Sequence, residues 1–82
     1  MEMLTKRKES EKLMRNLAIN IRKYRKQNNI TQEKLADDVE ISREYLRRFE
    51  TTYGKEGLSL VNIYRISKTL DVTIDDLIKD NE

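Results

Sequence analysis

The sequence predicts an all-α fold in which five helices pack into one small domain. The chain has 82 residues with only two glycines and no proline, which argues against a turn-rich β architecture. Hydrophobic side chains make up 37% of the residues and charged ones 39%, enough for one small core but not for a core with a deep substrate cleft. Apolar residues also recur at helical spacing in five segments.

The first predicted helix runs from about Ser10, which has the side chain of an N-cap, to about Asn28. We expect residues 1–9 to be a disordered or frayed basic tail and residues 80–82 to be a second tail. The folded domain is therefore predicted to span residues 10–79. The apolar stripe of the first helix consists of Leu13, Leu17, Ile21 and Tyr24.

Each of the other four helices is predicted to begin directly after a Ser or Thr that can cap it, namely Thr31, Ser42, Ser59 and Thr73. The turn between the second and third helices is too short for an antiparallel pair, so we expect these helices to cross steeply. The fifth helix is short and is anchored by Leu77 and Ile78. The fourth helix presents an apolar stripe made of Leu60, Ile63, Ile66 and Leu70.

The residue types that are missing exclude much chemistry. Without Cys or His there is no thiolate nucleophile, no imidazole base and no ordinary zinc or haem ligand. The neighbouring carboxylates at 37–38 and at 75–76 diverge from one another on a helix, so they do not form a metal site. No glycine-rich phosphate loop is present. We therefore predict that the protein is not an enzyme and has no metal or cofactor.

The distribution of charge and hydropathy bears on location and partners. No apolar run has the length of a signal peptide core or a membrane span, which predicts a soluble protein of the cytoplasm with no membrane contact. Residues 1–30 carry nine Lys/Arg and three Glu, whereas residues 31–82 carry eight basic and twelve acidic residues. This asymmetry is typical of an anion-binding face, although solvated helix surfaces also explain it.

Several segments in order resemble the phage-repressor-like helix-turn-helix family, the Cro/Xre group. They are Ile21-Arg22-Lys23-Tyr24-Arg25, Thr31-Gln32-Glu33-Lys34-Leu35-Ala36, residues 42–50, Ser59-Leu60 with Ile63 and Ile66, and Leu70-Asp71-Val72 with Asp76-Leu77. The resemblance covers about residues 17–78, and residues 42–45 and 58–63 look most like controller proteins of restriction–modification systems. It implies a compact five-helix, repressor-like DNA-binding domain, with the helix-turn-helix formed by its second and third helices.

The resemblance also implies roles for individual residues. The recognition helix after Ser42 would enter a major groove and contact bases. The alternative is that its polar side chains only solvate a surface helix. Arg25 and Glu50 are expected to form a structural bridge. The base-contacting candidates are Arg43, Glu44, Tyr45, Arg47 and Arg48, and the phosphate-contacting candidates are Gln32, Ser42 and Lys55.

The sequence departs from the family pattern at two places. Glu40 occupies a turn position where the family usually has glycine, because the backbone there often has a positive φ. The loop from Glu50 to Ser59 is about two residues longer than the common family spacing. Gly54 and Gly57 in this loop permit close approach of a phosphate, and a flexible exposed loop is the alternative.

We expect a sequence-specific regulator that binds double-stranded DNA, as a homodimer on a pseudo-palindromic operator. Ile74, Ile78 and Leu58 are candidates for the dimer surface, or they close the core of the monomer. The rival hypothesis is a protein-interaction module, such as an antitoxin or an adaptor, which would have a protein partner. Membrane binding by the basic first helix is disfavoured because its apolar stripe is expected in the core.

Overall fold

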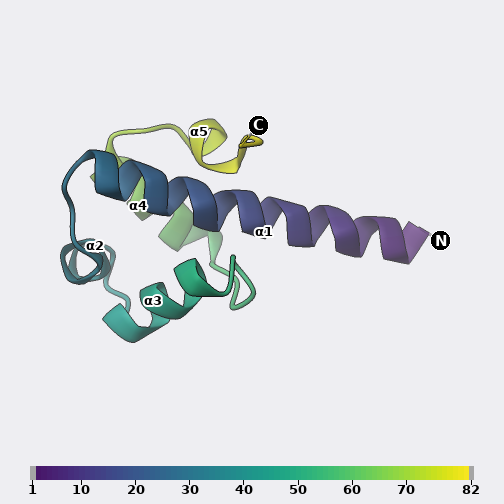
Figure 1. Cartoon of the computed structure of the whole chain (residues 1–82), viewed down its shortest axis with the longest axis horizontal. Coiled ribbons are helices and arrows are strands. Elements are labelled where there is room, and N and C mark those ends of the chain that lie inside the picture. Colours follow the sequence, from purple (N-terminus) through teal and green to yellow (C-terminus); the bar gives the residue numbers. More distant parts are fainter. Residues whose placement is uncertain (1, 82) are drawn as a thin grey trace.

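The computed structural model describes residues 2–81 of the chain, with side chains from residue 6 onward. The predicted all-α architecture is confirmed: helix α1 (Glu2–Gln27) is followed by α2 (Gln32–Val39), α3 (Arg43–Thr51), α4 (Leu60–Leu70) and α5 (Ile74–Ile78). Figure 1 shows α1 running the length of the molecule, with α5 along one side of it and α2 and α3 along the other.

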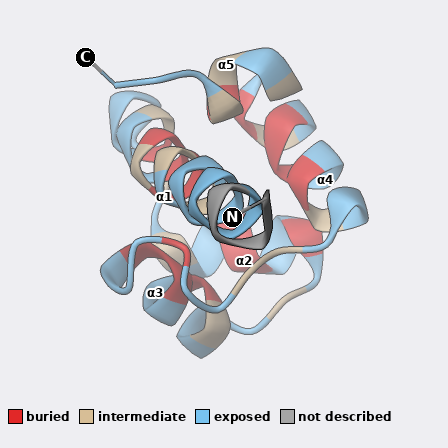
Figure 2. Cartoon of the chain, turned by 90° about the vertical axis from the view of Figure 1, so that its right-hand side faces the viewer, coloured by how far each residue is buried: buried red, intermediate tan, exposed pale blue. Residues whose placement is uncertain are grey.

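All five helices contribute to one hydrophobic core. The short pair α2 and α3 cannot bury its own apolar seam, so α1 and α4 cover it, and α5 closes the far side against α1. Figure 2 shows the buried residues on the sides of the helices that face one another. The largest fully buried apolar side chains are Leu17, Ile21, Leu35, Val39, Leu46, Phe49, Ile66, Leu70 and Leu77.

The four predicted helix starts after Ser or Thr are confirmed. The side chains of Thr31 and Ser42 accept hydrogen bonds from backbone N–H groups three residues later, each at 3.0 Å. Ser59 caps α4 in the same way, and Thr73 forms a reciprocal capping box with Asp76. Each cap satisfies a donor that the first turn of a helix leaves free.

The start of the first helix differs from the prediction. Helix α1 begins at Glu2, so Ser10 lies inside it and residues 2–9 are helical. A serine flanked by charged residues resembles an N-cap in sequence, but no glycine or proline interrupts the helix there. Met1 and Glu82, the ends of the two predicted tails, lie outside the described residues.

The first turns of α1 project beyond the other helices (Figure 1), and the longest dimension of the molecule is 41 Å, against 24 and 20 Å for the other two dimensions.

Two residues of the predicted apolar stripes are not in the core. Leu13 is 40% exposed and Leu60 is 71% exposed. Their spacing identifies the correct side of each helix, but Leu60 is the first residue of α4, and Leu13 lies in the part of α1 that precedes its first buried residue, Leu17. Leu60 instead joins two further exposed side chains of α4, Val61 at 57% and Tyr64 at 52%. We name these three residues the α4 apolar patch.

The residues suggested for the dimer surface occupy different positions from the α4 apolar patch. Ile74, Ile78 and Leu58 are half-buried and pack against the core cluster. They therefore close the core of the monomer, which is the alternative that the sequence left open.

The turn between α2 and α3 has the backbone conformation expected from the family pattern. Glu40 ends α2 with φ 61° and ψ 41°, in the left-handed region. This conformation costs a non-glycine residue about 1–2 kcal/mol. It brings the N–H of Ile41 to 3.0 Å from the carbonyl of Ala36, which reverses the chain and starts α3 at a steep angle to α2.

Candidate nucleic-acid interface

The inner face of α3 is attached to α1 by a buried ion pair. Nε of Arg25 donates to Oε2 of Glu50, and Nη2 donates to Oε1, each at 2.9 Å. The two side chains are only 9% and 1% exposed. The bridge implied by the family resemblance is thus present as a bidentate pair, which fixes α3 in both position and orientation relative to α1.

Further hydrogen bonds extend this pair to α2. Nη1 of Arg25 donates to the carbonyl of Ile30, and Nε2 of Gln32 donates to Oε1 of Glu50 at 3.1 Å. The Gln32 side chain, at the first position of α2, therefore links α2 to α3. The amide nitrogen of Gln32 is thus already used in the hydrogen bond to Glu50. Contact between Gln32 and a phosphate stays a prediction.

The outer face of α3 carries exposed charged side chains. Arg43, Glu44, Arg47 and Arg48 all lie on the surface. Arg47 donates to both carboxylate oxygens of Glu44, with Nε to Oε2 at 3.1 Å. This hydrogen bonding lowers the pKa of Glu44 and raises the pKa of Arg47. Four of the five base-contacting candidates therefore point outward, and two of them are paired with each other.

Tyr45, the fifth candidate, has a different environment. Its hydroxyl donates to the carbonyl oxygen of Gly57 at 2.7 Å, with a second contact to that of Glu56 at 3.2 Å, and its side chain is half-buried. Tyr45 therefore attaches α3 to the loop that precedes α4, a role that the sequence analysis missed. No local pattern indicates this contact, because Gly57 lies 12 residues further along the chain.

One glycine of the loop between α3 and α4 is needed for packing against α1. Gly54 is buried with φ 84°, and a Cβ atom there would lie 2.2 Å from the carbonyl oxygen of Met14 in α1. Gly54 is therefore needed for the close approach of this loop to α1, and contact between its backbone and a phosphate stays a prediction. Gly57 has φ 78° with open space around it, and Lys55 is exposed.

The N-terminal ends of α2 and α3 lie near one another on the surface. Arg43, Gln32 and Thr31 line a shallow hollow together with Glu33 and the edge of Arg25. Ser42 caps α3 from an exposed position. Free N–H groups at helix starts favour anions, and Arg43 adds a positive charge. The arrangement suits a phosphate or the edge of a base pair.

Within the described part of the chain, no helix is long and apolar enough to cross a membrane. The same residues contain no group of three or more acidic, His or Cys side chains able to hold a metal ion.

Comparison with known proteins agrees with this geometry. A sequence profile of the helix-turn-helix family matches residues 21–77, which is more than half of the chain. A search of curated proteins found no match. The matched region extends from the C-terminal part of α1 to α5 and includes the buried pair and the whole outer face of α3. The chain therefore belongs to the Cro/Xre-type helix-turn-helix family of DNA-binding regulators.

Proposed function

We propose that the protein is a sequence-specific regulator that places α3 in the major groove of double-stranded DNA. The observation that carries this proposal is the contrast between the two faces of α3. Its inner face is fixed by the buried pair between Arg25 and Glu50, whereas its outer face holds exposed arginines. A rigid helix with exposed bidentate donors suits base readout, because recognition needs donors held in register with the base edges.

The two unpaired arginines are the main candidates for base contacts. Arg43 lies at the start of α3 and Arg48 more than one turn later, and neither forms a salt bridge with residues 6–81. Each can donate two hydrogen bonds to O6 and N7 of a guanine. Lys55 and Ser42 lie on the surface near the two ends of α3 and are proposed phosphate contacts. Such a regulator acts where the DNA is, so we propose a cytoplasmic location at the nucleoid.

The α4 apolar patch supports a homodimer. One α3 helix reads few base pairs, so useful specificity requires two copies on a pseudo-palindromic site. Leu60, Val61 and Tyr64 present adjacent apolar side chains to solvent, as dimer interfaces of small proteins do. We propose that this patch packs against the same patch of a second copy, which buries it.

Selection from random duplexes tests DNA reading. We expect an enriched consensus with two related half-sites, and we expect Arg43→Ala to lose most of its affinity for that consensus. Lys79→Ala is the matched control, because Lys79 is an exposed cation that follows α5, away from α3 and from the α4 apolar patch. If no sequence is enriched, and binding to all duplexes is equally weak and salt-sensitive, the sequence-specific function is wrong.

The protein-interaction hypothesis makes a different prediction for the same protein. If α3 binds a protein, one partner should co-purify stoichiometrically in the absence of DNA, and Arg43→Ala should release it. A different outcome is also informative. If a protein partner is released only by changes in the α4 apolar patch, and the protein still selects its DNA consensus, the patch binds that partner and not a second copy.

Analytical ultracentrifugation tests the dimer. Val61→Asp places a charge in the α4 apolar patch and should shift the protein to a folded monomer, because Val61 is exposed in the monomer. Its melting temperature should lose only the concentration dependence that dimer formation gives the wild type. Val61→Thr keeps the size of the side chain and should weaken the dimer less. A wild-type protein that remains monomeric both free and on the selected duplex would contradict the homodimer.

A further inference from the structure

Helix α1 presents a row of cations on the side away from the core. Lys8, Arg15, Arg22 and Lys26 are all exposed. Their spacings of seven, seven and four residues place them within about 40° of one another around the helix axis, over a length of about 27 Å. We name these residues the α1 basic face. They lie on α1 and not on the outer face of α3.

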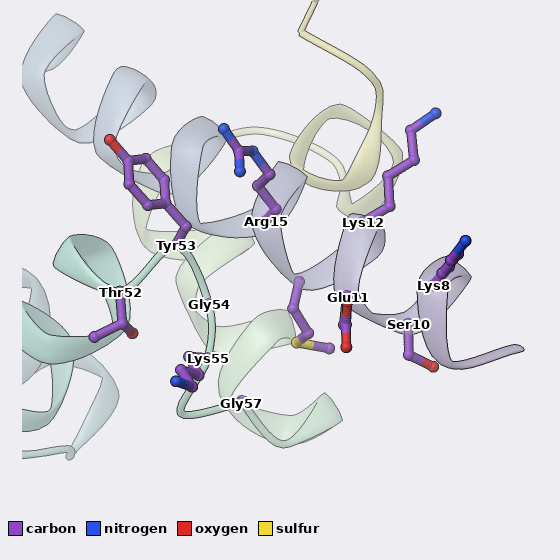
Figure 3. A pocket seen from close by; sticks show the side chains of 11 residues that line it. Lys8, Ser10, Glu11, Lys12, Arg15, Thr52, Tyr53, Gly54, Lys55 and Gly57 are labelled. Atoms are coloured by element: carbon purple, nitrogen blue, oxygen red, sulfur yellow. The ribbon is translucent and has the colours of Figure 1, made fainter. Parts of the chain in front are cut away.

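Figure 3 shows the N-terminal part of this face. Lys8, Lys12 and Arg15 extend to one side of α1, whereas Ser10 and Glu11 point to the other side. Lys12 is partly neutralised by Asp80, with Nζ at 3.4 Å from Oδ1. Arg15 lies over the ring of Tyr53 at 5.0 Å, which places this end of the face against the loop that follows α3.

The C-terminal part of the face borders α3 itself. Arg22 and Lys26 line a shallow cleft between α1 and the end of α3, together with Glu50 and Tyr53. Glu50 is the only acidic residue that lines this cleft, and its charge is already balanced by Arg25. No member of the α1 basic face forms a salt bridge with a carboxylate of residues 6–81.

Acidic side chains gather on the other flank of α1. Helix α5 packs there, with Asp75 and Asp76 in its first turn, and Asp80 follows it. Asp80 and Asp76 are balanced by Lys12 and Lys79, so this flank is close to neutral. A polyanion approaching the molecule is therefore attracted more strongly to the side formed by α3 and the α1 basic face than to the side formed by α5.

We propose that the α1 basic face binds the phosphodiester backbone of the same duplex whose major groove α3 reads. This inference rests on the proposed function. The ligand class follows from the charge pattern, because a row of unpaired cations beside the recognition helix matches the regular row of phosphates along one DNA strand. The contacts add affinity and register without reading sequence, and the projecting turns of α1 extend the footprint beyond the half-site that α3 covers.

The salt dependence of binding tests this proposal on the selected duplex. Lys8→Gln/Arg22→Gln/Lys26→Gln removes three charges from the face and keeps Arg15, which contacts Tyr53. The slope of log affinity against log salt concentration should become shallower by about 2 to 3 for each protomer bound, because each lost phosphate contact contributes about 0.9. The consensus sequence should remain the same, because no base contact is changed.

A matched variant controls for net charge. Lys12→Gln/Lys23→Gln/Lys79→Gln also removes three exposed cations, but from the side of α1 next to α5 and from the residue that follows α5. Its salt slope should equal that of the wild-type protein. Circular dichroism and thermal melting establish that both variants remain folded, as expected for exposed positions.

The outcomes separate this proposal from the proposed function. Equal slopes for both variants, with the consensus still enriched, would overturn the role of the α1 basic face and leave the reading of DNA by α3 intact. A smaller slope on random duplexes in a protein that selects no consensus would refute sequence reading and support phosphate binding by the face. If the variant loses only the binding of a second duplex, the assignment to the same duplex is wrong.

Discussion

Helix α3 takes part in two bidentate arginine–glutamate pairs, one on each face, and they differ mainly in burial. The inner pair, Arg25 with Glu50, joins α3 to α1 and is 9% and 1% exposed. The outer pair, Arg47 with Glu44, joins two turns of α3 and is 48% and 59% exposed. The same chemical groups therefore serve different purposes, because the surroundings decide what an ion pair contributes.

Burial makes the inner pair indispensable once the chain has folded. Taking two charges out of water is costly, and that cost is offset only while both partners and their hydrogen bonds are in place. The outer pair is solvated and screened by salt, so it contributes little to stability and can separate when another ligand arrives. The inner face of α3 is thus held in a fixed geometry, whereas the ion pair on its outer face can open so that its side chains bind another ligand.

The largest effect should come from breaking the inner pair. Arg25→Ala leaves Glu50 as an uncompensated buried charge, and we expect it to lower the free energy of unfolding by about 3–5 kcal/mol. Affinity for the selected duplex, expressed per folded molecule, should fall much less. Chemical denaturation and DNA titration at low temperature measure the two quantities. An unchanged melting temperature would contradict the role given to this pair.

A double variant sharpens this prediction. Arg25→Met/Glu50→Leu replaces both charges with apolar groups of similar size, which removes the buried charge as well as the attraction. It should be more stable than Arg25→Ala. It should not fully reach the wild type, because the carbonyl of Ile30 and the amide of Gln32 lose their partners.

The outer face should show the opposite pattern. Arg48→Ala removes an exposed side chain, so the melting temperature should stay within about 2 °C of the wild type. Discrimination between the selected duplex and one with a substituted base pair should fall by about ten- to a hundred-fold at one position of each half-site. A loss of affinity that is equal for all duplexes would assign Arg48 to a phosphate instead of a base.

Features set by neighbouring residues were predictable from sequence. The caps Thr31, Ser42, Ser59 and Thr73 depend on a side chain reaching a backbone group three residues away, so their positions follow from local chemistry. Interior apolar residues such as Leu17 and Ile66 follow from helical spacing. The buried pair and the conformation of Glu40 were expected because of the family resemblance, which supplied tertiary information that composition lacks.

Features that depend on distant partners were missed. Spacing places Leu13 and Leu60 on the apolar side of their helices, but only the tertiary arrangement shows that other elements leave them exposed. Tyr45 has the position of a base contact until the carbonyl of Gly57 is seen beside its hydroxyl. Gly54 is required by the carbonyl of Met14, which no local pattern indicates. The start of α1 was misplaced because Ser10 resembles a cap.

A smaller effect is expected at the turn that sets the angle between α2 and α3. Glu40→Gly relieves a left-handed conformation and should raise the free energy of unfolding by about 1 kcal/mol, after allowance for the greater freedom of glycine in the unfolded chain. The melting temperature should rise by about 4–8 °C. Glu40→Ala keeps the strained conformation and serves as the control, so equal stability of the two variants would refute strain as the cause.

The smallest effect concerns the protonation of the outer pair. The hydrogen bond from Arg47 lowers the pKa of Glu44, so the contribution of this carboxylate to stability is complete above the ordinary glutamate range and is lost as the pH falls through the lowered pKa. Arg47→Ala should raise the pKa of Glu44 toward the ordinary value, measured by NMR titration of the side-chain carboxyl. The melting temperature at neutral pH should hardly change, because both side chains are exposed. At the inner pair the effect on protonation cannot be measured apart from the effect on stability, because Arg25→Ala should itself destabilise the fold. An unchanged pKa of Glu44 in Arg47→Ala would show that the outer pair does not persist in solution, and Arg47 would then be as available to DNA as Arg48.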